Sequence, residues 1–337
     1  GDPCQNCGVS EPTSIDPSLT FEQARASIPD LTTQLADSHY NATISYFDRL
    51  ADDVWIFGVR PDDGPVSFIP GQYTSLGLDY WEPRIDHALE SDIDKQWPKL
   101  ARRSYSVSTP MFTSDDYHVD HGVADLARCE DLEDIEIYAV LVRPEGDFVP
   151  GLTPPLALKH QGDRLFMGRK MAGRYDATAV DDPEAPLVFL STGTGEAPQM
   201  AMIVELLRTG HTGPIVSVVT ARHWSDLVYV DKNRALEKRF DNYTYLPIPT
   251  REPDVEKRYI QDVVRTDFTP DNLGFDLDPT RARVFVCGNP DMIGLPDESG
   301  EEPLYPETTG VAEILVERGF KLDKRKDPGN IHFEEFW

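Results

Sequence analysis

The sequence has few cysteines, few basic residues and no long hydrophobic run. Its 337 residues include only 4 cysteines, which are scattered, so no disulfide framework is expected. Cys4 and Cys7 have the spacing of a zinc or redox pair, but no second pair follows at ligand spacing. We interpret them as an incidental pair and expect no metal site.

Long apolar segments and cationic residues are both scarce. No run approaches the roughly 20 apolar residues of a membrane helix, which predicts no membrane insertion. No basic and apolar signal peptide opens the chain, so the expected location is cytoplasmic.

Against 59 acidic residues there are 32 lysines and arginines, giving a formal net charge of −27. We expect no nucleic-acid or anionic-membrane binding, because both require clustered cations. This acidity is typical either of a protein from a salt-rich cell or of an ordinary acidic cytosolic protein.

A glycine turn in the second half of the chain is the clearest local signal. The sequence Thr192-Gly193-Thr194-Gly195 follows the apolar run 186–189 and precedes residues 199–207, which are apolar at helical spacing. Backbone N–H groups between a strand and a helix can hold a phosphate, and glycine lets a ligand approach closely. Such a turn can also be plain chain topology, and this motif alone leaves both interpretations open.

We expect three parts in the chain: an acidic, partly ordered extension over residues 1–40, and two domains over 41–182 and 183–337. Short runs with period-two alternation predict an antiparallel β-barrel in the first domain, interrupted by acidic insertions at 80–101 and 112–133. The second domain alternates strand and helix patterns, which predicts a doubly wound α/β sheet. Its expected strands are residues 187–191, 215–220, 243–248 and 283–287. We favour a monomer.

Five short motifs occur in an order that resembles the ferredoxin–NADP reductase family. They are Pro70-Gly71-Gln72-Tyr73, Arg103-Ser104-Tyr105-Ser106, Gly193-Thr194-Gly195-Glu196-Ala197-Pro198, Cys287-Gly288-Asn289-Pro290 and the terminal Phe336-Trp337. The resemblance covers roughly residues 42–337. The last two motifs are similar to those of bacterial members, whereas segments 250–252 and 257–261 resemble plant-type members. The resemblance implies an FAD-binding barrel followed by an NADP-binding α/β domain.

The resemblance implies an FAD site in the first domain. Arg103 presents a planar guanidinium suited to the pyrophosphate, and the ring of Tyr105 can stack on the flat flavin. Ser106 can hydrogen-bond the flavin N5 edge, although on residue type alone Tyr105 and Ser106 could equally be ordinary barrel residues. Thr153 matches a helix-start Ser or Thr of the family, but Pro150 stands where the family has glycine. The implied FAD-binding residues are Arg103, Tyr105, Ser106, Val140, Thr153 and Trp337.

The resemblance implies an NADP site in the second domain. Arg251 would pair with the 2′-phosphate, because only a cation distinguishes NADP from NAD, and Tyr259 would stack on the adenine or help to hold the phosphate. Lys257 or Arg258 would add charge. Glu196 departs from the family's apolar residue and would repel a pyrophosphate unless its side chain points away. The implied NADP-binding residues are Thr192, Gly193, Thr194, Gly195, Arg222, Thr250, Arg251, Arg258, Tyr259, Gln261, Cys287 and Gly288.

The resemblance also implies a reaction, in which FAD exchanges a hydride with NADP(H) and single electrons with ferredoxin or flavodoxin. The implied catalytic residues are Ser106, Cys287 beside the nicotinamide, Glu335 as a proton carrier and Trp337 over the flavin. A buried structural cysteine and a surface glutamate are the alternatives for Cys287 and Glu335. The alternative functions are a reductase component for an oxygenase, a quinone or ferric reductase, and a flavin-binding module without turnover. The absence of a ferredoxin-like cysteine cluster favours an external carrier.

An acidic carrier would be repelled by this chain unless a local basic face exists or salt screens the charge. The candidates for such a face are Lys99, Arg102, Lys170, Arg174 and the cations within residues 321–326.

Overall fold

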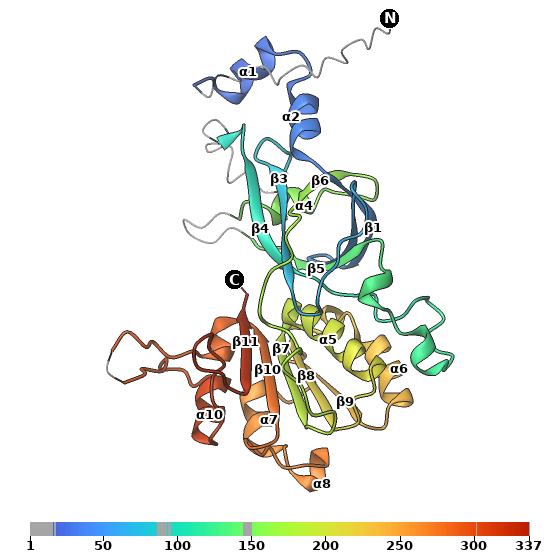
Figure 1. Cartoon of the computed structure of the whole chain (residues 1–337). Helices are drawn as coiled ribbons and strands as arrows, with labels where there is room; N and C mark the ends of the chain where they lie inside the picture. Colours follow the sequence, from blue (N-terminus) through green and yellow to red (C-terminus); the bar gives the residue numbers. More distant parts are fainter. Residues whose placement is uncertain are drawn as a thin grey trace, which may run out of the picture.

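The computed structural model describes residue 16 and residues 18–85, 93, 96–143, 150–300 and 302–336. The expected roles of Cys4, Cys7 and Trp337 lie outside the described residues. An antiparallel sheet is followed along the chain by a parallel sheet, and the two are stacked end to end (Figure 1).

The first sheet is antiparallel and has the strand order β4-β3-β6-β1-β2-β5. Its strands are β1 (Ala42–Ala51), β2 (Val54–Pro61), β3 (Tyr73–Asp79), β4 (Leu100–Ser106), β5 (Ile135–Val140) and β6 (Arg164–Met167). Buried side chains such as Ile44, Phe57 and Leu76 form its core. The predicted antiparallel sheet is confirmed. Among the described residues, the two end strands approach each other at an isolated bridge between Ser108 and Glu136, and no further pairing closes a barrel.

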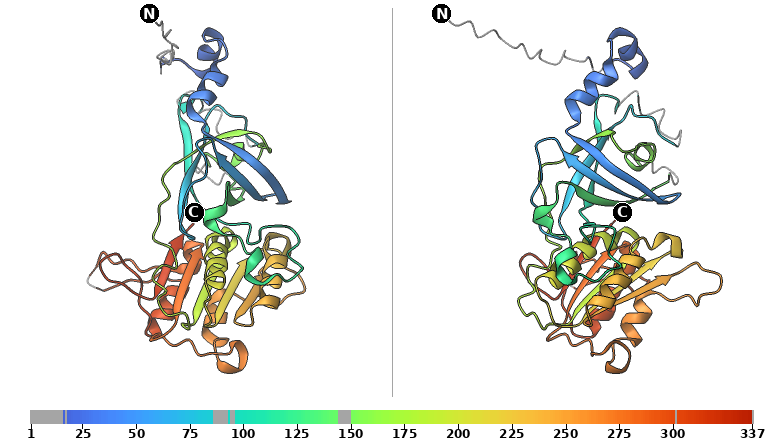
Figure 2. Two further views of the ribbon diagram at one scale, coloured as in Figure 1. Left: turned by 45° about the vertical axis from the view of Figure 1, so that its right-hand side comes forward. Right: turned by 90° about the vertical axis from the view of Figure 1, so that its right-hand side faces the viewer.

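The described part of the N-terminal extension contains two helices. It forms α1 (Phe21–Ser27), which begins at a Thr20 capping box, and α2 (Leu31–His39). Both helices pack around Trp97, which the first acidic insertion contributes and which is fully buried. They stand at the end of the antiparallel sheet that is remote from the parallel sheet (Figure 2). The sequence did not predict this small core because its two halves lie some 60 residues apart and are each only weakly apolar.

The second sheet is parallel and has the strand order β11-β10-β7-β8-β9. Its strands are β7 (Leu187–Thr192), β8 (Ile215–Ala221), β9 (Tyr243–Pro249), β10 (Arg283–Gly288) and β11 (Ile331–Glu335). Alternate residues of β7 enter two different cores, Leu187 and Phe189 on one face and Val188 and Leu190 on the other. The chain runs outward from β7 to β9 and then returns to β10, so the direction of winding reverses between β7 and β10. Ligands of such sheets bind at that reversal.

Helices α5 (Glu196–Arg208) and α6 (Val230–Arg239) cover one face, and α7 (Ile260–Thr266) and α10 (Val311–Glu317) cover the other. The predicted two-sided α/β sheet is therefore confirmed, with β11 as a strand that the sequence did not predict. No helix in the described ranges is long and apolar enough to cross a membrane. The shorter helices are α4 (Thr153–Leu156), α8 (Pro270–Leu273) and α9 (Pro290–Ile293), and the 3-10 turns are η2 (Gly122–Asp125), η3 (Cys129–Asp131), η4 (Gly193–Gly195) and η5 (Trp224–Asp226).

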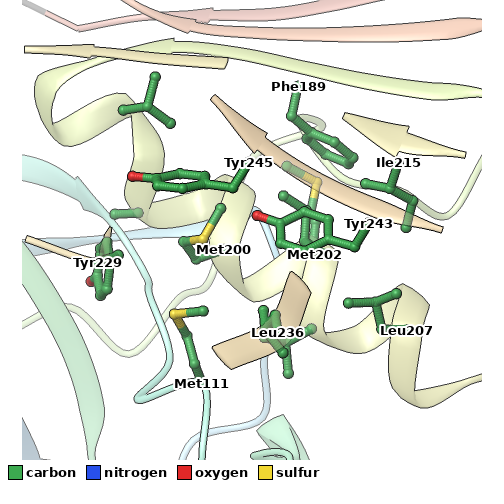
Figure 3. Close-up of a cluster of buried hydrophobic side chains, with 14 of the residues drawn as sticks. Met111, Phe189, Met200, Met202, Leu207, Ile215, Tyr229, Leu236, Tyr243 and Tyr245 are labelled. Carbon is green, nitrogen blue, oxygen red and sulfur yellow. The ribbon is translucent and has the colours of Figure 1, made fainter. Parts of the chain in front are cut away.

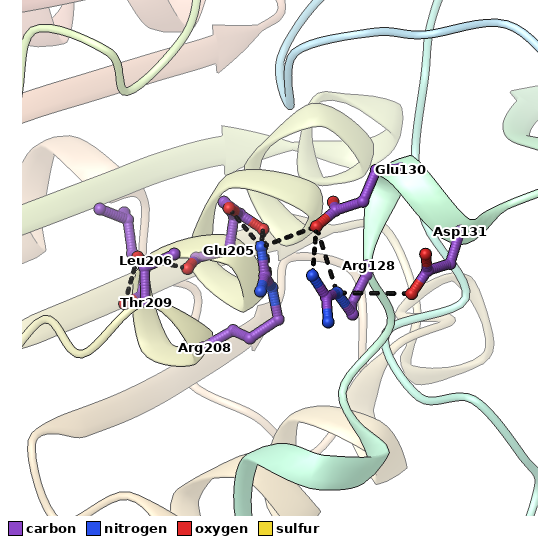
Figure 4. Close-up of polar contacts among 7 residues, drawn as sticks. All are labelled: Arg128, Glu130, Asp131, Glu205, Leu206, Arg208 and Thr209. Atoms are coloured by element: carbon purple, nitrogen blue, oxygen red, sulfur yellow. Dashed lines mark hydrogen bonds and ion pairs between the residues drawn. The ribbon is translucent and has the colours of Figure 1, made fainter.

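The second acidic insertion joins the two domains. Met111 and Phe112, at its start, are buried in the same core as α5 and α6, where Met111 lies near Met200 and Leu236 (Figure 3). A second contact is polar: Glu130 pairs with Arg208 of α5 at 3.5 Å, within a group of charges that also includes Arg128 and Glu205 (Figure 4).

Arg239 at the end of α6 makes the most buried of these polar contacts. Its Nη1 donates to Asp125 Oδ1 at 2.6 Å, and its Nη2 donates to the carbonyls of Tyr117 and Val119. Its guanidinium also lies 4.7 Å from the centre of the Phe112 ring. One arginine of the second domain therefore anchors three loop positions of the insertion.

The first residue of α5, Glu196, is buried in the core of the second domain. Its Oε1 accepts hydrogen bonds from the Tyr245 hydroxyl at 3.0 Å and from Asn233 Nδ2 at 3.1 Å. Burial raises the pKa of Glu196 to about 8, even though both hydrogen bonds lower it. The folded protein therefore holds this carboxyl protonated at neutral pH.

The Glu196→Gln substitution is expected to change how stability depends on pH. Because the pKa of Glu196 is higher in the folded state than its ordinary value of 4.5, its contribution is complete below pH 4.5 and is lost as the pH rises towards about 8. The uncharged amide lacks this loss. In urea unfolding, the free energy of unfolding of the variant relative to that of the wild type should increase by on the order of 1 kcal/mol per pH unit between pH 5 and 8. A stability difference that stays constant over this range would contradict the assignment.

Replacement of Arg239 by alanine is expected to lower the free energy of unfolding by roughly 3 kcal/mol, because it leaves Asp125 without its buried partner. The neighbouring Lys238→Ala provides the control, since Lys238 is exposed and has no ion pair among the described residues. That control should change the free energy by less than about 0.5 kcal/mol. Equal losses in the two variants, measured by urea unfolding, would show that the anchor contributes nothing.

Candidate functional site

A cavity of about 1670 Å³ lies where the two sheets meet. Strands β4 and β5 of the antiparallel sheet form one wall, and the loops after β7, β8, β9 and β10 of the parallel sheet form the other. All of these loops leave the carboxyl ends of parallel strands, at the reversal of winding between β7 and β10. The fold thus brings together motifs that lie up to about 200 residues apart in the sequence.

The first-domain wall contains most of the predicted FAD residues. Arg103, Tyr105, Ser106, Val140 and Thr153 all line the cavity. The hydroxyl of Thr153 accepts a hydrogen bond from the Val142 N–H at 3.1 Å and so is partly used within the loop.

Pro150 and Gly151 line the same part of the cavity. A Cβ atom on Gly151 would lie 3.8 Å from Arg103 Nη2 and 3.7 Å from the Tyr80 hydroxyl. Both are ordinary contact distances, so neither group requires glycine at this position.

The glycine turn after β7 packs directly against the turn after β10. Gly288 has a φ of +133°, and a Cβ there would clash with Thr192, whose Oγ1 accepts the Asn289 N–H at 2.8 Å. A Cβ on Gly195 would clash with the Cys287 carbonyl. Thr192, Gly193, Thr194 and Gly288 line the cavity, whereas Gly195 faces the neighbouring strand.

Glu196 does not oppose an anion in this turn. Its carboxyl points into the core towards Asn233 and Tyr245 and is held protonated at neutral pH. The departure from an apolar residue at this position is therefore compatible with a phosphate at the turn.

Some of the cations expected to bind the 2′-phosphate line the cavity, and others do not. Arg222, Thr250, Arg251, Tyr259 and Gln261 line the cavity. The Arg251 N–H donates to the Arg222 carbonyl at 2.8 Å, which aligns the loops after β8 and β9.

Arg258 is not brought to the cavity. Its Nη2 donates to Asp267 at 2.7 Å, and it borders a separate hollow beside β9. Lys257 does not line the cavity either, but its Nζ lies 5.1 Å from the centre of the ring of Tyr259, which does.

Cys287 lies behind the cavity wall instead of lining it. Its side chain is fully buried, and burial raises the pKa of the thiol well above its usual value. Among the described residues it is a free cysteine. The structure places this side chain beneath the turn that Gly195 and Gly288 form.

Ser106 contacts the carboxylate of Glu334, the neighbour in sequence of the predicted proton carrier Glu335. Ser106 Oγ donates to Glu334 Oε2 at 3.4 Å, and burial raises the pKa of Glu334 to about 7. Glu335 also lines the cavity but makes no hydrogen bond to Ser106. The sequence could not separate the two because the strand β11, whose alternation sets their directions, was not predicted. Phe336 lines the cavity as well, and its N–H donates to the Gly288 carbonyl at 2.8 Å.

Several cavity residues were not predicted. Tyr138 on β5 and His223 and Asp226 after β8 all line it. A tyrosine in a buried strand and polar residues directly after a parallel strand are weak signals that the sequence did contain. No group of His, Cys, Asp and Glu in the described part of the chain could hold a metal ion.

The predicted basic face is neutralised only in part. Lys321 pairs with Asp327, Lys324 with Glu298, and Arg174 lies 3.9 Å from Asp323. The remaining candidates have no ion-pair partner among the described residues; they are Lys99, Arg102, Lys170, Arg325 and Lys326. Arg102 lies 4.0 Å from the centre of the Phe166 ring.

Comparison with known proteins gives a consistent result. The family model of the oxidoreductase NAD-binding domain matches residues 189–296. A ferredoxin–NADP reductase of Pseudomonas aeruginosa is 28% identical over 204 residues, which cover 56% of this chain and 75% of the relative. The electron transfer component of toluate 1,2-dioxygenase from Pseudomonas putida is 29% identical over 302 residues, covering 88% of this chain and 67% of the relative.

The fold has similar solved structures. The crystal structure of a ferredoxin NADP+ reductase from Neisseria gonorrhoeae with bound FAD and NADP superposes with a TM-score of 0.63 at 20% identity, covering 88% of this chain and 98% of the other. A cytochrome P450 reductase from Amycolatopsis gives a TM-score of 0.57 at 20% identity, covering 88% of this chain and 69% of the other. These matches show that the chain is similar in sequence to ferredoxin–NADP reductases and to oxygenase electron transfer components, and that it shares the fold of the Neisseria gonorrhoeae reductase.

Proposed function

We propose that the chain is an FAD-dependent reductase that exchanges a hydride with NADP(H) and single electrons with ferredoxin or flavodoxin. One observation carries the proposal: a single cavity has Arg103, Tyr105 and Ser106 on one wall and the cations Arg222 and Arg251 on the other. The names of the curated relatives support it. We further propose a monomeric, cytoplasmic protein.

The residues present fit both cofactors. In the proposed first domain, residues 41–182, Tyr105 offers an aromatic face to the flavin and Arg103 a planar cation to the pyrophosphate. In the proposed second domain, residues 183–337, the backbone of the β7 turn would hold the NADP pyrophosphate, and Arg251 would hold the 2′-phosphate. Bound FAD supplies the conversion between a two-electron hydride transfer and one-electron transfers.

The chain's own contribution at the flavin edge would be to move a proton. During NADPH oxidation, the hydrogen that arrives as a hydride leaves as a proton after its electrons have passed on. Ser106 can relay that proton to Glu334, whose pKa of about 7 lets it accept and release protons near neutral pH. This assigns to Glu334 the role that the sequence pattern gave to Glu335.

A second candidate function is a reductase component for an oxygenase. The toluate dioxygenase relative favours it, because its similarity extends over 88% of this chain. The two functions share the cavity and differ only in the protein that receives the electrons.

The decisive experiment is to purify the protein with FAD and mix it with NADPH or NADH in a stopped-flow instrument. Flavin absorbance should bleach, and faster with NADPH. Reduced protein is then offered ferredoxin, flavodoxin and an oxygenase component. A protein that binds no flavin, or binds it without bleaching, would overturn the proposal. Oxidation by the oxygenase component alone would favour the second candidate.

The Arg251→Ala substitution tests the nucleotide site. It is expected to raise the KM for NADPH about 10- to 100-fold, since it removes a charge-assisted contact to the 2′-phosphate, and to leave the KM for NADH nearly unchanged. Arg265→Ala on the exposed side of α7 serves as the control for loss of one positive charge. Steady-state rates with a dye acceptor measure both. A similar loss with NADPH and NADH would argue against a 2′-phosphate contact.

The pH dependence of turnover tests the proton path. Glu334 can accept a proton only when it is ionised, so NADPH oxidation by the wild type should rise as the pH increases through about 7. Glu334→Gln should lower kcat and remove this inflection, whereas Glu335→Gln should retain it. If the inflection is lost in the Glu335 variant instead, the original sequence-based assignment is correct.

A further inference from the structure

We infer that Tyr138 and Tyr229 are positioning residues. Their hydroxyl groups attach the proposed nucleotide-binding loop after β8 to strand β5, which belongs to the proposed flavin-binding wall of the cavity. This inference rests on the proposed function and concerns the same cavity. The two hydroxyl groups would hold the loop, residues 222–229, at the distance from β5 that a bound nucleotide requires.

The first link comes from Tyr138, which lines the cavity two residues before Val140. Its hydroxyl donates to the Asp226 carbonyl at 3.0 Å, across the boundary between the two domains. Asp226 in turn closes the loop that carries Arg222, because its Oδ2 accepts the His223 N–H at 3.1 Å. Two hydrogen bonds in series therefore connect β5 to His223, which is next in sequence to the proposed phosphate-binding Arg222.

The second link comes from Tyr229 and uses the same strand. Its hydroxyl donates to Glu136 Oε1 at 3.0 Å, so its single hydrogen is used. Ser108 Oγ, at 2.9 Å, must then donate to the Tyr229 oxygen. Glu136 and Tyr138 are alternate residues of β5 and point to one face, so both links leave the strand on the side of the second domain.

The two tyrosines support each other. Their rings meet edge to face, with centroids 5.8 Å apart and an interplanar angle of 84°, and Figure 3 shows Tyr229 in the shared core beside Met111 and Met200. Both rings are almost fully buried. Burial raises the pKa of both hydroxyls well above the usual value, so they remain donors throughout the pH range of the enzyme. Because hydrogen bonds are directional, these two buried bonds restrict the position of the loop more than apolar packing alone would.

Apart from the tyrosine links and contacts with α6, the loop's hydrogen bonds to other described segments run to the neighbouring loop. The Trp224 N–H donates to Glu252 at 2.8 Å, and the Arg251 N–H donates to the Arg222 carbonyl. These bonds align the loops after β8 and β9 with each other. The loop otherwise meets the antiparallel sheet through packing, of η5 against β1 and of Leu227 in the shared core. The tyrosine links add directed hydrogen bonds to that packing.

Tyr46 offers a matched control. Its hydroxyl donates to the other oxygen of the same carboxylate, Glu136 Oε2, at 2.9 Å, yet Tyr46 belongs to β1 and makes no hydrogen bond to the loop. Tyr46→Phe thus removes a hydroxyl from the same buried carboxylate without loosening residues 222–229.

The experiment compares Tyr138→Phe, Tyr229→Phe and Tyr46→Phe in the FAD-loaded full chain. Binding of 2′-phospho-AMP, which carries the adenosine and phosphates without the nicotinamide, is measured by titration. The two loop variants should raise its Kd and the KM for NADPH about two- to tenfold. Their kcat with a dye and their FAD absorbance should stay close to wild type. Tyr46→Phe should lower the melting temperature but leave the Kd unchanged.

Two results would overturn the inference: an unchanged Kd in both loop variants, or an equal rise in Tyr46→Phe, which would indicate a general structural loss. If one loop variant fails to fold, the other decides. Failure of the wild type to bind 2′-phospho-AMP would instead count against the proposed function.

Discussion

The contact on which the rest of the structure depends is the hydrophobic core that both domains share around Met111. The segment after β4 inserts this side chain between α5 and α6, so the two sheets are fused through a packed interior and cannot rotate freely about a linker. The cavity exists because the sheets are held at this separation. The buried pair of Arg239 with Asp125 and the more exposed pair of Glu130 with Arg208 reinforce the same joint.

Much of the architecture could be predicted from local pattern. Period-two runs gave the antiparallel strands, and the alternation of apolar strand with helix gave the parallel sheet. The glycine turn at 192–195 was informative because its conformation depends on the absence of a side chain, which is a property of the sequence itself. The sequence shows only a weak helical pattern at α1 and did not predict α2, because both helices are stabilised by Trp97, which lies far away in the chain.

The site was less predictable than the fold because a motif does not fix where a side chain points. Arg258 turns away because Asp267 satisfies it, and Cys287 lies behind the wall because the glycine turns pack over it. Glu334 and Glu335 differ only in the face of β11 to which each belongs. Each outcome is decided by a tertiary neighbour. Glu196 illustrates the same point: an acidic residue beside the glycine turn loses its charge because it is buried, although the hydrogen bonds from Tyr245 and Asn233 oppose that effect.

The position of β11 has a practical consequence for handling the protein. Phe336 lines the cavity and its N–H donates to the Gly288 carbonyl, so whatever is joined beyond it emerges beside the cavity. The opposite end of the chain leads into α1, on the far side of the antiparallel sheet (Figure 2). An affinity tag, a fluorescent label or a surface linker is therefore better placed at the amino end, where it leaves the cavity open.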